Sequence, residues 1–263
     1  MTLLNEFDLT GKVVFITGAG RGIGRGIAEV LADAGADIAI NALTSKNVEI
    51  TAADIRKKTK RNILPVLADV TRSDEVSRAV EQVMAEFGRI DILVNNLGDA
   101  MRHPLVKLPE KEKDTISDEY LHKIININMM GSILCTRAVG PQMLERRYGK
   151  IINISSFTAG HGGGEVVIYS LAKAAVVGFT RTQALEWAPY NICINSIAPG
   201  LYPEPREMTE EREKNLAKWA ERSIPLKRTG RLREVGYLAL YLASSASDYM
   251  TGQTLYLDGG LSL

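Results

Sequence analysis

A tyrosine and a lysine four positions apart are the first residues whose types and spacing suggest chemistry. They are Tyr169 and Lys173, in a segment whose apolar residues recur at helical intervals. Residues four apart project from one face of a helix, so the phenol and the ammonium group can act together. A tyrosine with an ordinary pKa of about 10 is a weak base at neutral pH, but a neighbouring cation favours its phenolate. The pair is predicted to transfer a proton, although this spacing alone also occurs on ordinary helix surfaces.

Hydroxyl groups for the same reaction lie upstream, where an apolar strand is expected to end. Ser155 and Ser156 stand fourteen and thirteen residues before Tyr169. Neighbouring side chains on a strand point in opposite directions, so only one serine is expected to face the tyrosine. A hydroxyl there can hold the oxygen of a substrate by a hydrogen bond as charge develops on it. The residues alone leave both serines open.

A glycine-rich turn near the N-terminus is suited to binding an anion. Residues 17–24 read Thr-Gly-Ala-Gly-Arg-Gly-Ile-Gly, between an expected strand and an expected helix. Such a turn lets backbone amides approach a pyrophosphate at the start of the helix. The alternative is a tight strand-to-helix connection that needs glycine only for a positive φ.

The elements that must position these residues alternate between short β-rich runs and longer amphipathic segments. This alternation is typical of βαβ units, so the predicted fold class is α/β, a Rossmann-like doubly wound parallel sheet flanked by helices. The expected strands are Val13–Thr17, Ile38–Asn41, Ile63–Ala68, Ile90–Asn95, Lys150–Ile154, Ile192–Ile197 and Thr254–Leu257. The expected helices are Gly22–Ala34, Ser73–Phe87, Asp118–Arg146, Tyr169–Ala188 and Leu232–Ala243. A further stretch, Leu201–Ile224, leaves the carboxyl end of a strand and is predicted to be a substrate lid.

Composition narrows the class of protein. The chain has 263 residues, 45% of them hydrophobic, which suits one domain spanning 1–263. A formal charge of +1 gives no support for a nucleic-acid partner, and no apolar run is long enough for a membrane span. The N-terminal residues lack a secretory pattern, and the only two cysteines, Cys135 and Cys193, suggest neither disulfides nor a metal site. A cytoplasmic enzyme acting on a small molecule is expected.

Several motifs in sequence order resemble the short-chain dehydrogenase/reductase family from about Leu9 to Gly260. They are TGxxxGxG at Thr17, Gly18, Gly22 and Gly24, Asp69-Val70, Asn95-Asn96-Leu97-Gly98, Asn128 before Gly131, Ser156, Tyr169 with Lys173, and Pro199-Gly200. The overall pattern looks most like the 3-oxoacyl-carrier-protein reductases of that family. Two departures are Leu97 in place of the family's alanine and the run Leu201-Tyr202-Pro203-Glu204 where a threonine often follows.

The resemblance implies a role for each matching residue. Asn128, Ser156, Tyr169 and Lys173 are the implied catalytic residues, with Ser156 chosen over Ser155 by the family's spacing and Asn128 supporting a water beside Lys173. Asn126 is expected to be polar filler, and Asn95 partly a bridge between strand ends. The implied cofactor-binding residues are Gly18, Arg21, Gly22, Ile23, Gly24, Thr44, Ser45, Asp69, Val70, Asn96, Gly98, Tyr169, Lys173, Pro199 and Gly200. A homotetramer is the implied assembly.

The run after the second strand decides the expected cofactor. An acid there would grip the ribose diol of NAD and repel the extra phosphate of NADP, but the run Asn-Ala-Leu-Thr-Ser-Lys at 41–46 contains none. By analogy the acid would stand near Ala42. Thr44, Ser45, Lys46 and Arg21 offer donors to a phosphate, so NADP is favoured and NAD stays possible. Alternatively, Ser45 only caps the next helix.

The predicted function is NADP(H)-dependent hydride transfer between nicotinamide and a carbonyl or secondary alcohol, with Tyr169 as general acid and base. The alternatives are an NAD(H)-dependent alcohol or sugar dehydrogenase of the same family, and a dinucleotide-binding regulator without catalysis. An isomerase or lyase that uses a bound dinucleotide is a third possibility. Fold analogy does not choose the substrate.

Overall fold

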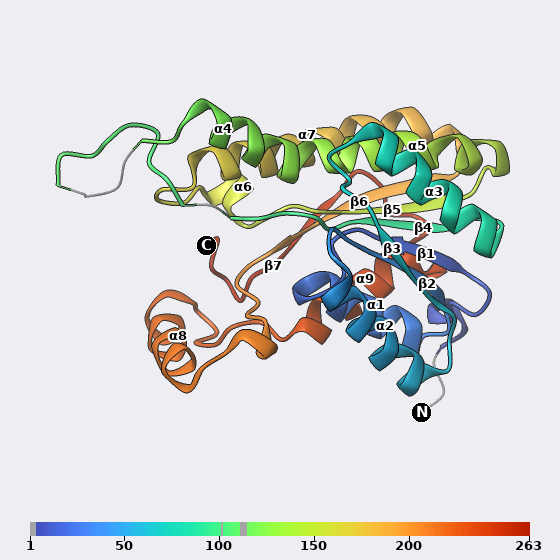
Figure 1. Cartoon of the computed structure of the whole chain (residues 1–263), viewed down its shortest axis with the longest axis horizontal. Helices are drawn as coiled ribbons and strands as arrows, with labels where there is room; N and C mark the ends of the chain where they lie inside the picture. The colour runs from blue at the N-terminus through green and yellow to red at the C-terminus, as the bar shows by residue number, and fades with distance from the viewer. Residues whose placement is uncertain (1–3, 101, 111–114) are drawn as a thin grey trace.

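The computed structural model describes residues 4–100, 102–110 and 115–263. Its centre is a sheet of seven parallel strands in the order β3-β2-β1-β4-β5-β6-β7, which confirms the predicted doubly wound fold. The strands are β1 Val13–Ile16, β2 Asp37–Ala42, β3 Ile63–Leu67, β4 Ile92–Asn95, β5 Gly149–Ile154, β6 Ile192–Pro199 and β7 Thr254–Leu257. Helices cover both faces of this sheet (Figure 1).

The helices form two layers. In Figure 1 one layer contains α1 and α2 with α9, and the other contains α3 and α5 with α4 and α7. Their bounds are α1 Gly22–Asp33, α2 Ser45–Thr59, α3 Ser73–Phe87, α4 Asp118–Ile125, α5 Gly131–Arg146, α6 Thr158–His161, α7 Val167–Trp187, α8 Glu210–Ser223 and α9 Leu232–Ala243. None of the helices in the described ranges is both long and apolar enough to cross a membrane.

Strand β1 is apolar along its whole length, as expected for a strand with helices on both faces of its sheet. All four residues of β1 are buried, and Ile16 pairs with Ile40 of β2 on one side and with Val94 of β4 on the other. Such continuous apolar runs are typical of parallel strands enclosed by helices.

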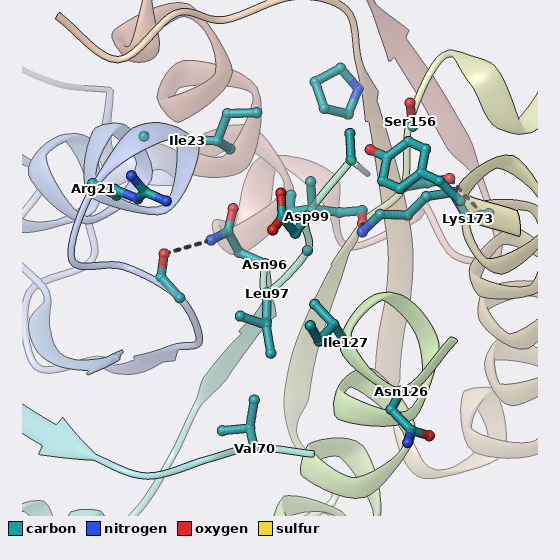
Figure 2. Close-up of a pocket in the computed structure, with 18 of the residues that line it drawn as sticks. Arg21, Ile23, Val70, Asn96, Leu97, Asp99, Asn126, Ile127, Ser156 and Lys173 are labelled. Carbon is teal, nitrogen blue, oxygen red and sulfur yellow. Dashed lines mark hydrogen bonds between the residues drawn. The ribbon is translucent and has the colours of Figure 1, made fainter. Parts of the chain in front are cut away.

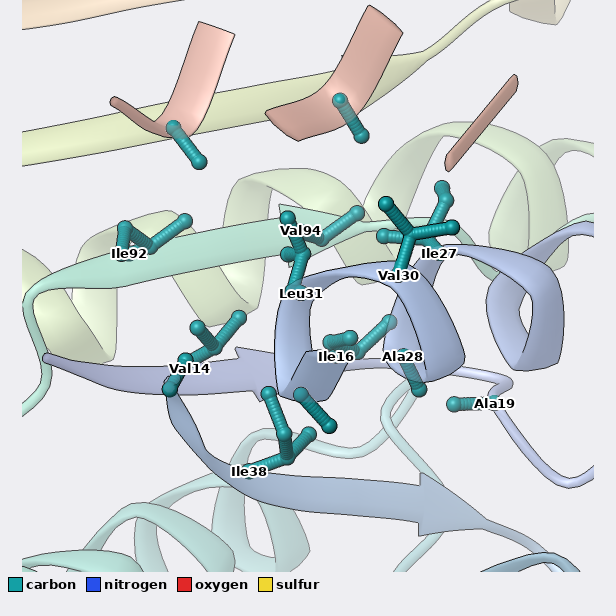
Figure 3. Close-up of a cluster of buried hydrophobic side chains, with 14 of the residues drawn as sticks. Val14, Ile16, Ala19, Ile27, Ala28, Val30, Leu31, Ile38, Ile92 and Val94 are labelled. Carbon is teal, nitrogen blue, oxygen red and sulfur yellow. The ribbon is translucent and has the colours of Figure 1, made fainter. Parts of the chain in front are cut away.

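One core packs between the sheet and the layer that holds α1 and α9. Ile27 and Leu31 of α1 are fully buried, and Figure 3 shows them facing Val14, Ile16 and Val94 of the sheet. Their spacing of four residues places both on one face of the helix. Each such side chain contributes roughly 1.5–3 kcal/mol by leaving water. A second core, with Phe15 and Leu93 among its members, fills the opposite face of the sheet.

The order of the strands fixes where ligands can bind. The chain runs outward from β1 through β2 to β3 and then returns to place β4 on the other side of β1. The loops after β1 and β4 therefore diverge, and in open α/β sheets the crevice at that point holds the ligand. The glycine turn follows β1, and the Asn-Asn-Leu-Gly run begins at the end of β4.

Several elements differ in detail from the predicted ones; β4, for example, begins at Ile92 instead of Ile90, and β6 ends at Pro199 instead of Ile197. The expected helix over Asp118–Arg146 is continuous, but it contains a π-helical turn at Asn126–Met130. The helix that carries the tyrosine begins two residues earlier than expected, at Val167. The charged part of Leu201–Ile224 forms α8, whose first turn is capped by the Thr209 hydroxyl accepting from the Arg212 amide.

Candidate active site

A cleft of about 1380 Å³ opens beyond the carboxyl ends of the strands. Most of the residues expected to act on substrate or cofactor line it: Gly18, Arg21, Gly22, Ile23, Thr44, Asp69, Val70, Asn96, Gly98, Ser156, Tyr169, Lys173, Pro199 and Gly200. Figure 2 shows Arg21, Asn96, Asp99, Ser156 and Lys173 arranged around this space. The structure thus brings the glycine turn and the tyrosine–lysine pair to one site.

Gly24, Ser45 and Asn128 are not among the residues that line the cleft. A Cβ on Gly24 would lie 2.5 Å from Nδ2 of Asn96, so this glycine allows close packing beneath the turn instead of contact with a ligand. Ser45 is the first residue of α2, and the N-cap residue is Thr44, whose side chain makes no capping hydrogen bond. The alternative that Ser45 caps this helix is therefore wrong, because the extended backbone that a cap requires belongs to Thr44.

The glycine turn depends on backbone conformations that favour glycine. Gly18 and Gly22 have φ values of 62° and 58°. The side-chain Nδ2 of Asn96 donates to the carbonyls of Thr17 and Gly18 at 2.9 and 3.0 Å, and so fixes the turn from the end of the neighbouring strand. The turn delivers the chain to α1 with the first backbone amides of that helix directed outward.

The start of α1 already holds an anionic group of the same chain. The Gly22 amide donates to the Glu204 carboxylate, and the Arg21 guanidinium pairs with Glu207. Backbone amides and the helix dipole make such a terminus attractive to carboxylates and phosphates alike. The donor set at this end of the cleft therefore fits the pyrophosphate of a dinucleotide.

One end of the cleft is lined by the last residue of β2 and by residues that follow β2 and β3. Ala42, Leu43, Thr44 and Asn47 border it, and none of them carries an acid. Asp69 is engaged locally, because its carboxylate accepts from the Thr71 amide at 2.9 Å and from the Thr71 hydroxyl at 2.7 Å. This end is open to an additional phosphate group.

Within the Asn-Asn-Leu-Gly run, Asn95 supports the fold and Gly98 borders the cleft. Asn95 is buried and donates to Thr136 and Asn153 at 3.0 and 2.8 Å, so it bridges strand ends as expected. Gly98 lies against Lys173 and Asn128, because a Cβ there would be 2.7 Å from Lys173 Nζ and 2.9 Å from Asn128 Oδ1. Only a glycine fits this position without a displacement of one of these atoms.

Lys173 lies at the base of the cleft and is almost completely buried. Its Nζ donates to the Ile154 carbonyl at 2.9 Å and stands 5.9 Å from the centre of the Tyr169 ring. Burial lowers the pKa of Lys173 to about 8. The lysine is therefore charged at neutral pH and loses its charge in mild alkali.

Tyr169 and Ser156 meet at the reacting end of the cleft. Burial raises the pKa of Tyr169, the hydrogen bond with Ser156 lowers it, and the nearby Asp99 carboxylate raises it further. The net direction is upward, whereas the sequence argument expected Lys173 to favour the phenolate; removal of the phenol from water outweighs the other influences here. Tyr169 is therefore held protonated, as a proton donor must be.

The two serines point in opposite directions, as alternation along the chain predicts. The Ser155 hydroxyl donates to the Lys173 carbonyl at 2.9 Å and so attaches the strand end to α7. The Ser156 oxygen accepts from the Thr158 amide at 3.2 Å and from the Thr158 hydroxyl at 3.0 Å. Ser156 also hydrogen-bonds with Tyr169, and this contact lowers the pKa of that phenol.

Asn128 holds the loop that borders the catalytic groups. Its Oδ1 accepts from the Asp99 amide at 3.0 Å, and its Nδ2 donates to the carbonyls of Asp99 and Ile124 at 3.0 and 2.9 Å. Asn128 lies in the π-helical turn, a deviation that often marks functional sites. Asn126, expected to be polar filler, is exposed and borders the cleft.

The bend after β6 closes the far wall. The Phe157 amide donates to the Pro199 carbonyl at 3.1 Å, and the Gly200 amide donates to the Leu257 carbonyl at 3.1 Å. A Cβ on Gly200 would stand 2.7 Å from Cα of Asp258, so the chain can pass there only as glycine. This bend directs the following residues back over the cleft.

Several residues that line the cleft were not singled out from the sequence. They are Asn47, Asp99, Arg102, Glu119, His122 and Lys123. Asp99 directly follows the Asn-Asn-Leu-Gly motif, so its adjacency to that motif was a usable signal. The others lie in a loop and on helix surfaces where no pattern separates a cleft residue from a solvated one.

Comparisons with known proteins agree with this geometry. Residues 18–262 match the family described as Enoyl-(Acyl carrier protein) reductase. The chain is 36% identical over 253 residues to the 3-oxoacyl-(acyl-carrier-protein) reductase FabG of Thermotoga maritima, covering 96% of this chain and 98% of that protein.

Two solved structures show the same fold. One is a short-chain type dehydrogenase/reductase from Mycobacterium marinum, 37% identical, with a TM-score of 0.87 and 99% of each chain covered. The other is L-sorbose reductase from Gluconobacter frateurii complexed with NADPH and L-sorbose, 29% identical, with a TM-score of 0.90 and 98% of each chain covered. The chain therefore belongs to the short-chain dehydrogenase/reductase family and is a hydride-transferring oxidoreductase that acts on carbonyl or alcohol groups.

Proposed function

We propose that this protein is an NADPH-dependent reductase that converts a ketone into a secondary alcohol, with Tyr169 as the proton donor. The observation that carries the proposal is the meeting of Tyr169, Ser156 and Lys173 at the end of a cleft that begins at a glycine turn. The raised pKa of Tyr169 keeps its proton in place until a substrate oxygen accepts it.

The residues that would hold the cofactor follow the length of the cleft. Gly18, Gly22 and Ile23 would hold the pyrophosphate, with Asp69 and Val70 at the adenine. Asn96 and Gly98, with Pro199 and Gly200, would border the nicotinamide half. When bound, the cofactor supplies the hydride. Ala42 in place of an acid, together with Arg21 and Thr44, supports NADPH over NADH, as does the relative solved with NADPH.

Each catalytic side chain has a distinct proposed role. Ser156 donates a hydrogen bond to the substrate oxygen, and Tyr169 transfers its proton to that oxygen as charge develops. The ammonium group of Lys173 stabilises the phenolate that forms on Tyr169. Asn128 positions the Asp99 loop and supports a water molecule that returns the proton to the site.

Asp99 favours a second candidate for the substrate class. Its carboxylate has no hydrogen bond or ion pair to another side chain within the described ranges, and it borders the cleft near Tyr169. An unpaired carboxylate can accept hydrogen bonds from substrate hydroxyl groups. This feature favours a polyhydroxy ketone, like the substrate of L-sorbose reductase, as a second candidate substrate. The first candidate is a 3-oxoacyl thioester, the substrate class in the name of the FabG relative.

The organisation of the whole chain forms part of the proposal. We propose that residues 1–263 work as one domain, with residues 201–224 as a substrate lid, in a cytoplasmic homotetramer. The lid assignment is supported by α8 and the residues before it, which follow the bend at Gly200. Sedimentation at micromolar protein concentration tests the assembly, and a monomer would contradict it.

A substrate panel tests the proposed function. Ketoses, keto sugar acids and 3-oxoacyl thioesters are each supplied with NADPH or NADH, and the loss of nicotinamide absorbance is followed. The proposal expects turnover with at least one ketone and a preference for NADPH. Binding of NADPH without turnover of any substrate would support the regulator instead, and substrate conversion without an absorbance change would indicate an isomerase or lyase.

A further inference from the structure

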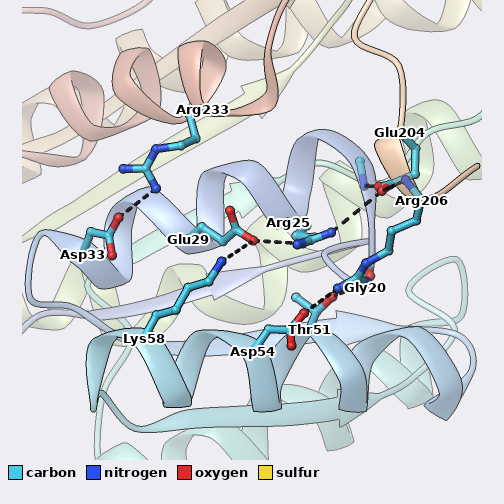
Figure 4. A network of polar contacts seen from close by, with 11 residues as sticks. Gly20, Arg25, Glu29, Asp33, Thr51, Asp54, Lys58, Glu204, Arg206 and Arg233 are labelled. Carbon is cyan, nitrogen blue, oxygen red and sulfur yellow. Dashed lines mark hydrogen bonds and ion pairs between the residues drawn. The ribbon is translucent and has the colours of Figure 1, made fainter. Parts of the chain in front are cut away.

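The segment that follows β6 places two carboxylates on the glycine turn. Glu204 and Glu207 contact Gly22 and Arg21, residues 182 and 186 positions away in the chain. Residues 201–208 are called the acidic strap below. Figure 4 shows Glu204 and Arg206 of the strap beside Arg25 of α1 and Thr51 and Asp54 of α2.

We propose that Glu204 and Glu207 compete with the cofactor for the glycine turn and thereby set both the affinity for dinucleotide and the preference for NADPH. This inference rests on the proposed function, because it assumes that the cleft binds NADPH. Glu204 would oppose any dinucleotide, whereas Glu207 would oppose only the one that carries the additional phosphate.

Glu204 occupies the position that attracts a pyrophosphate. Its carboxylate accepts a hydrogen bond from the backbone amide of Gly22, the first residue of α1. It also lies 3.8 Å from the Arg25 guanidinium. The side chain is only 9% exposed, so solvent screens its charge weakly. A pyrophosphate at the same helix terminus would place two anions side by side. The carboxylate must therefore withdraw, or repel the ligand, whenever a dinucleotide binds.

Glu207 competes for a different group. It pairs with Arg21, the only arginine of the glycine turn. Arg21 lines the cleft and is the expected partner of the additional phosphate of NADPH. The pair is well exposed, at 61% and 46% for the two side chains, so its competition is weaker than that of Glu204. NADH lacks that phosphate and would not require Arg21 to leave Glu207.

The strap has anchors that do not involve either carboxylate. Arg206 donates to Asp54 at 2.7 Å and to Thr51 at 3.3 Å, both residues of α2. At its beginning, the Tyr202 hydroxyl donates to the Leu257 carbonyl at 2.9 Å. Pro203 and Pro205 flank Glu204 and restrict the backbone on both sides of it. Replacement of a single carboxylate is therefore expected to leave the strap in place.

The test compares three single substitutions that each remove one negative charge. They are E204Q, E207Q and the control E210Q. Glu210 is exposed at the start of α8, and among the described residues it forms no ion pair with Arg21 or Arg25. Dissociation constants for NADPH and for NADH are measured by nicotinamide fluorescence, independently of turnover. Thermal unfolding without ligand confirms that each variant is folded.

The expected pattern separates the two carboxylates. E204Q lowers the dissociation constants for NADPH and NADH alike by about tenfold, because it removes a competing charge at a helix terminus. E207Q lowers the dissociation constant for NADPH by roughly threefold, a small effect because the ion pair that it removes is exposed. The dissociation constant for NADH stays unchanged. E210Q changes neither constant. In an R21A background, E207Q no longer affects NADPH, because the group for which it competes is gone.

The opposite pattern overturns the inference. Weaker or unchanged binding of both dinucleotides in E204Q would show that Glu204 supports the cofactor or does not meet it. Equal effects of E207Q on NADPH and NADH would remove the assignment to Arg21. If E204Q unfolds, E204D serves instead, because its shorter side chain withdraws the charge from Gly22 and is also expected to tighten both dinucleotides. A wild-type protein that binds neither dinucleotide would instead refute the proposed function.

Discussion

The ammonium nitrogen of Lys173 donates to the carbonyl of Ile154 at 2.9 Å, and lies 5.9 Å from the centre of the Tyr169 ring. In the proposed mechanism Lys173 therefore influences the tyrosine as a nearby charge and not as a hydrogen-bond partner. Because burial lowers the pKa of the lysine to about 8, that charge is present at neutral pH and disappears in mild alkali.

This relationship predicts the pH dependence of ketone reduction. Below pH 8 Lys173 is protonated and stabilises the phenolate that Tyr169 forms; above it the charge is lost, while Tyr169 stays protonated because its own pKa is raised. The rate constant kcat/KM for reduction is expected to fall as pH rises through about 8. A profile measured from pH 6 to 10, with NADPH affinity determined at each pH as the control, checks this. A flat profile over that range would contradict it.

The hydrogen bonds of Asn128 predict a positioning role. N128A removes the two bonds to the Asp99 backbone and leaves the Asp99 amide without its partner. The expected result is a loss of activity of roughly 10- to 100-fold, by displacement of a positioning group, and a loss of about 1–3 kcal/mol in unfolding free energy. Kinetics and urea unfolding measure the two. The matched control is N126A, because Asn126 is an exposed residue of the same π-helical turn. Only a small change in stability is expected for N126A.

Substitution of Gly98 is expected to reduce activity more than stability. In G98A the new Cβ would lie 2.7 Å from Lys173 Nζ and 2.9 Å from Asn128 Oδ1, so one of these groups must move. Turnover is expected to fall at least tenfold while the thermal midpoint changes little. G178A on α7 is the control, because nothing lies within 4 Å of its Cβ position. Wild-type turnover in G98A would show that the catalytic groups tolerate displacement.

Much of this arrangement could be predicted from the sequence because it is local. Periodicity located the strands, and β7 at Thr254–Leu257 has the expected bounds. The spacing of Tyr169 and Lys173 placed both on one helix, and the end of a strand brought Ser156 to them. Each of these inferences needs only the geometry of a single element or the common edge of a parallel sheet.

The remaining features depend on contacts between distant or irregular segments. The periodicity of the sequence does not predict the π-helical turn around Asn128, because its hydrogen bonds span only one residue more than those of an α-helix. The contact of Glu204 with Gly22 joins positions 182 residues apart, through a proline-bounded segment without a repeating pattern. The net rise in the pKa of Tyr169 follows from burial, which a list of neighbouring charges does not reveal.

The core between α1 and the sheet predicts a stability effect. Leu31 is fully buried against the sheet, and its truncation would leave a cavity. L31A is expected to lower the free energy of unfolding by about 2–5 kcal/mol. On α2, I50A is the control, because Ile50 is 46% exposed, and a change within about 0.5 kcal/mol is expected. Chemical denaturation measures both, and equal effects would contradict the assignment of this core.

The most direct test of the account is turnover by Y169F. Phenylalanine retains the ring and removes only the hydroxyl group, whose proton Tyr169 is proposed to transfer. The account predicts that NADPH oxidation with the best ketone falls by roughly 10²- to 10⁴-fold, while NADPH binding and thermal stability stay near wild type. Turnover at the wild-type rate would contradict the central claim that Tyr169 is the proton donor.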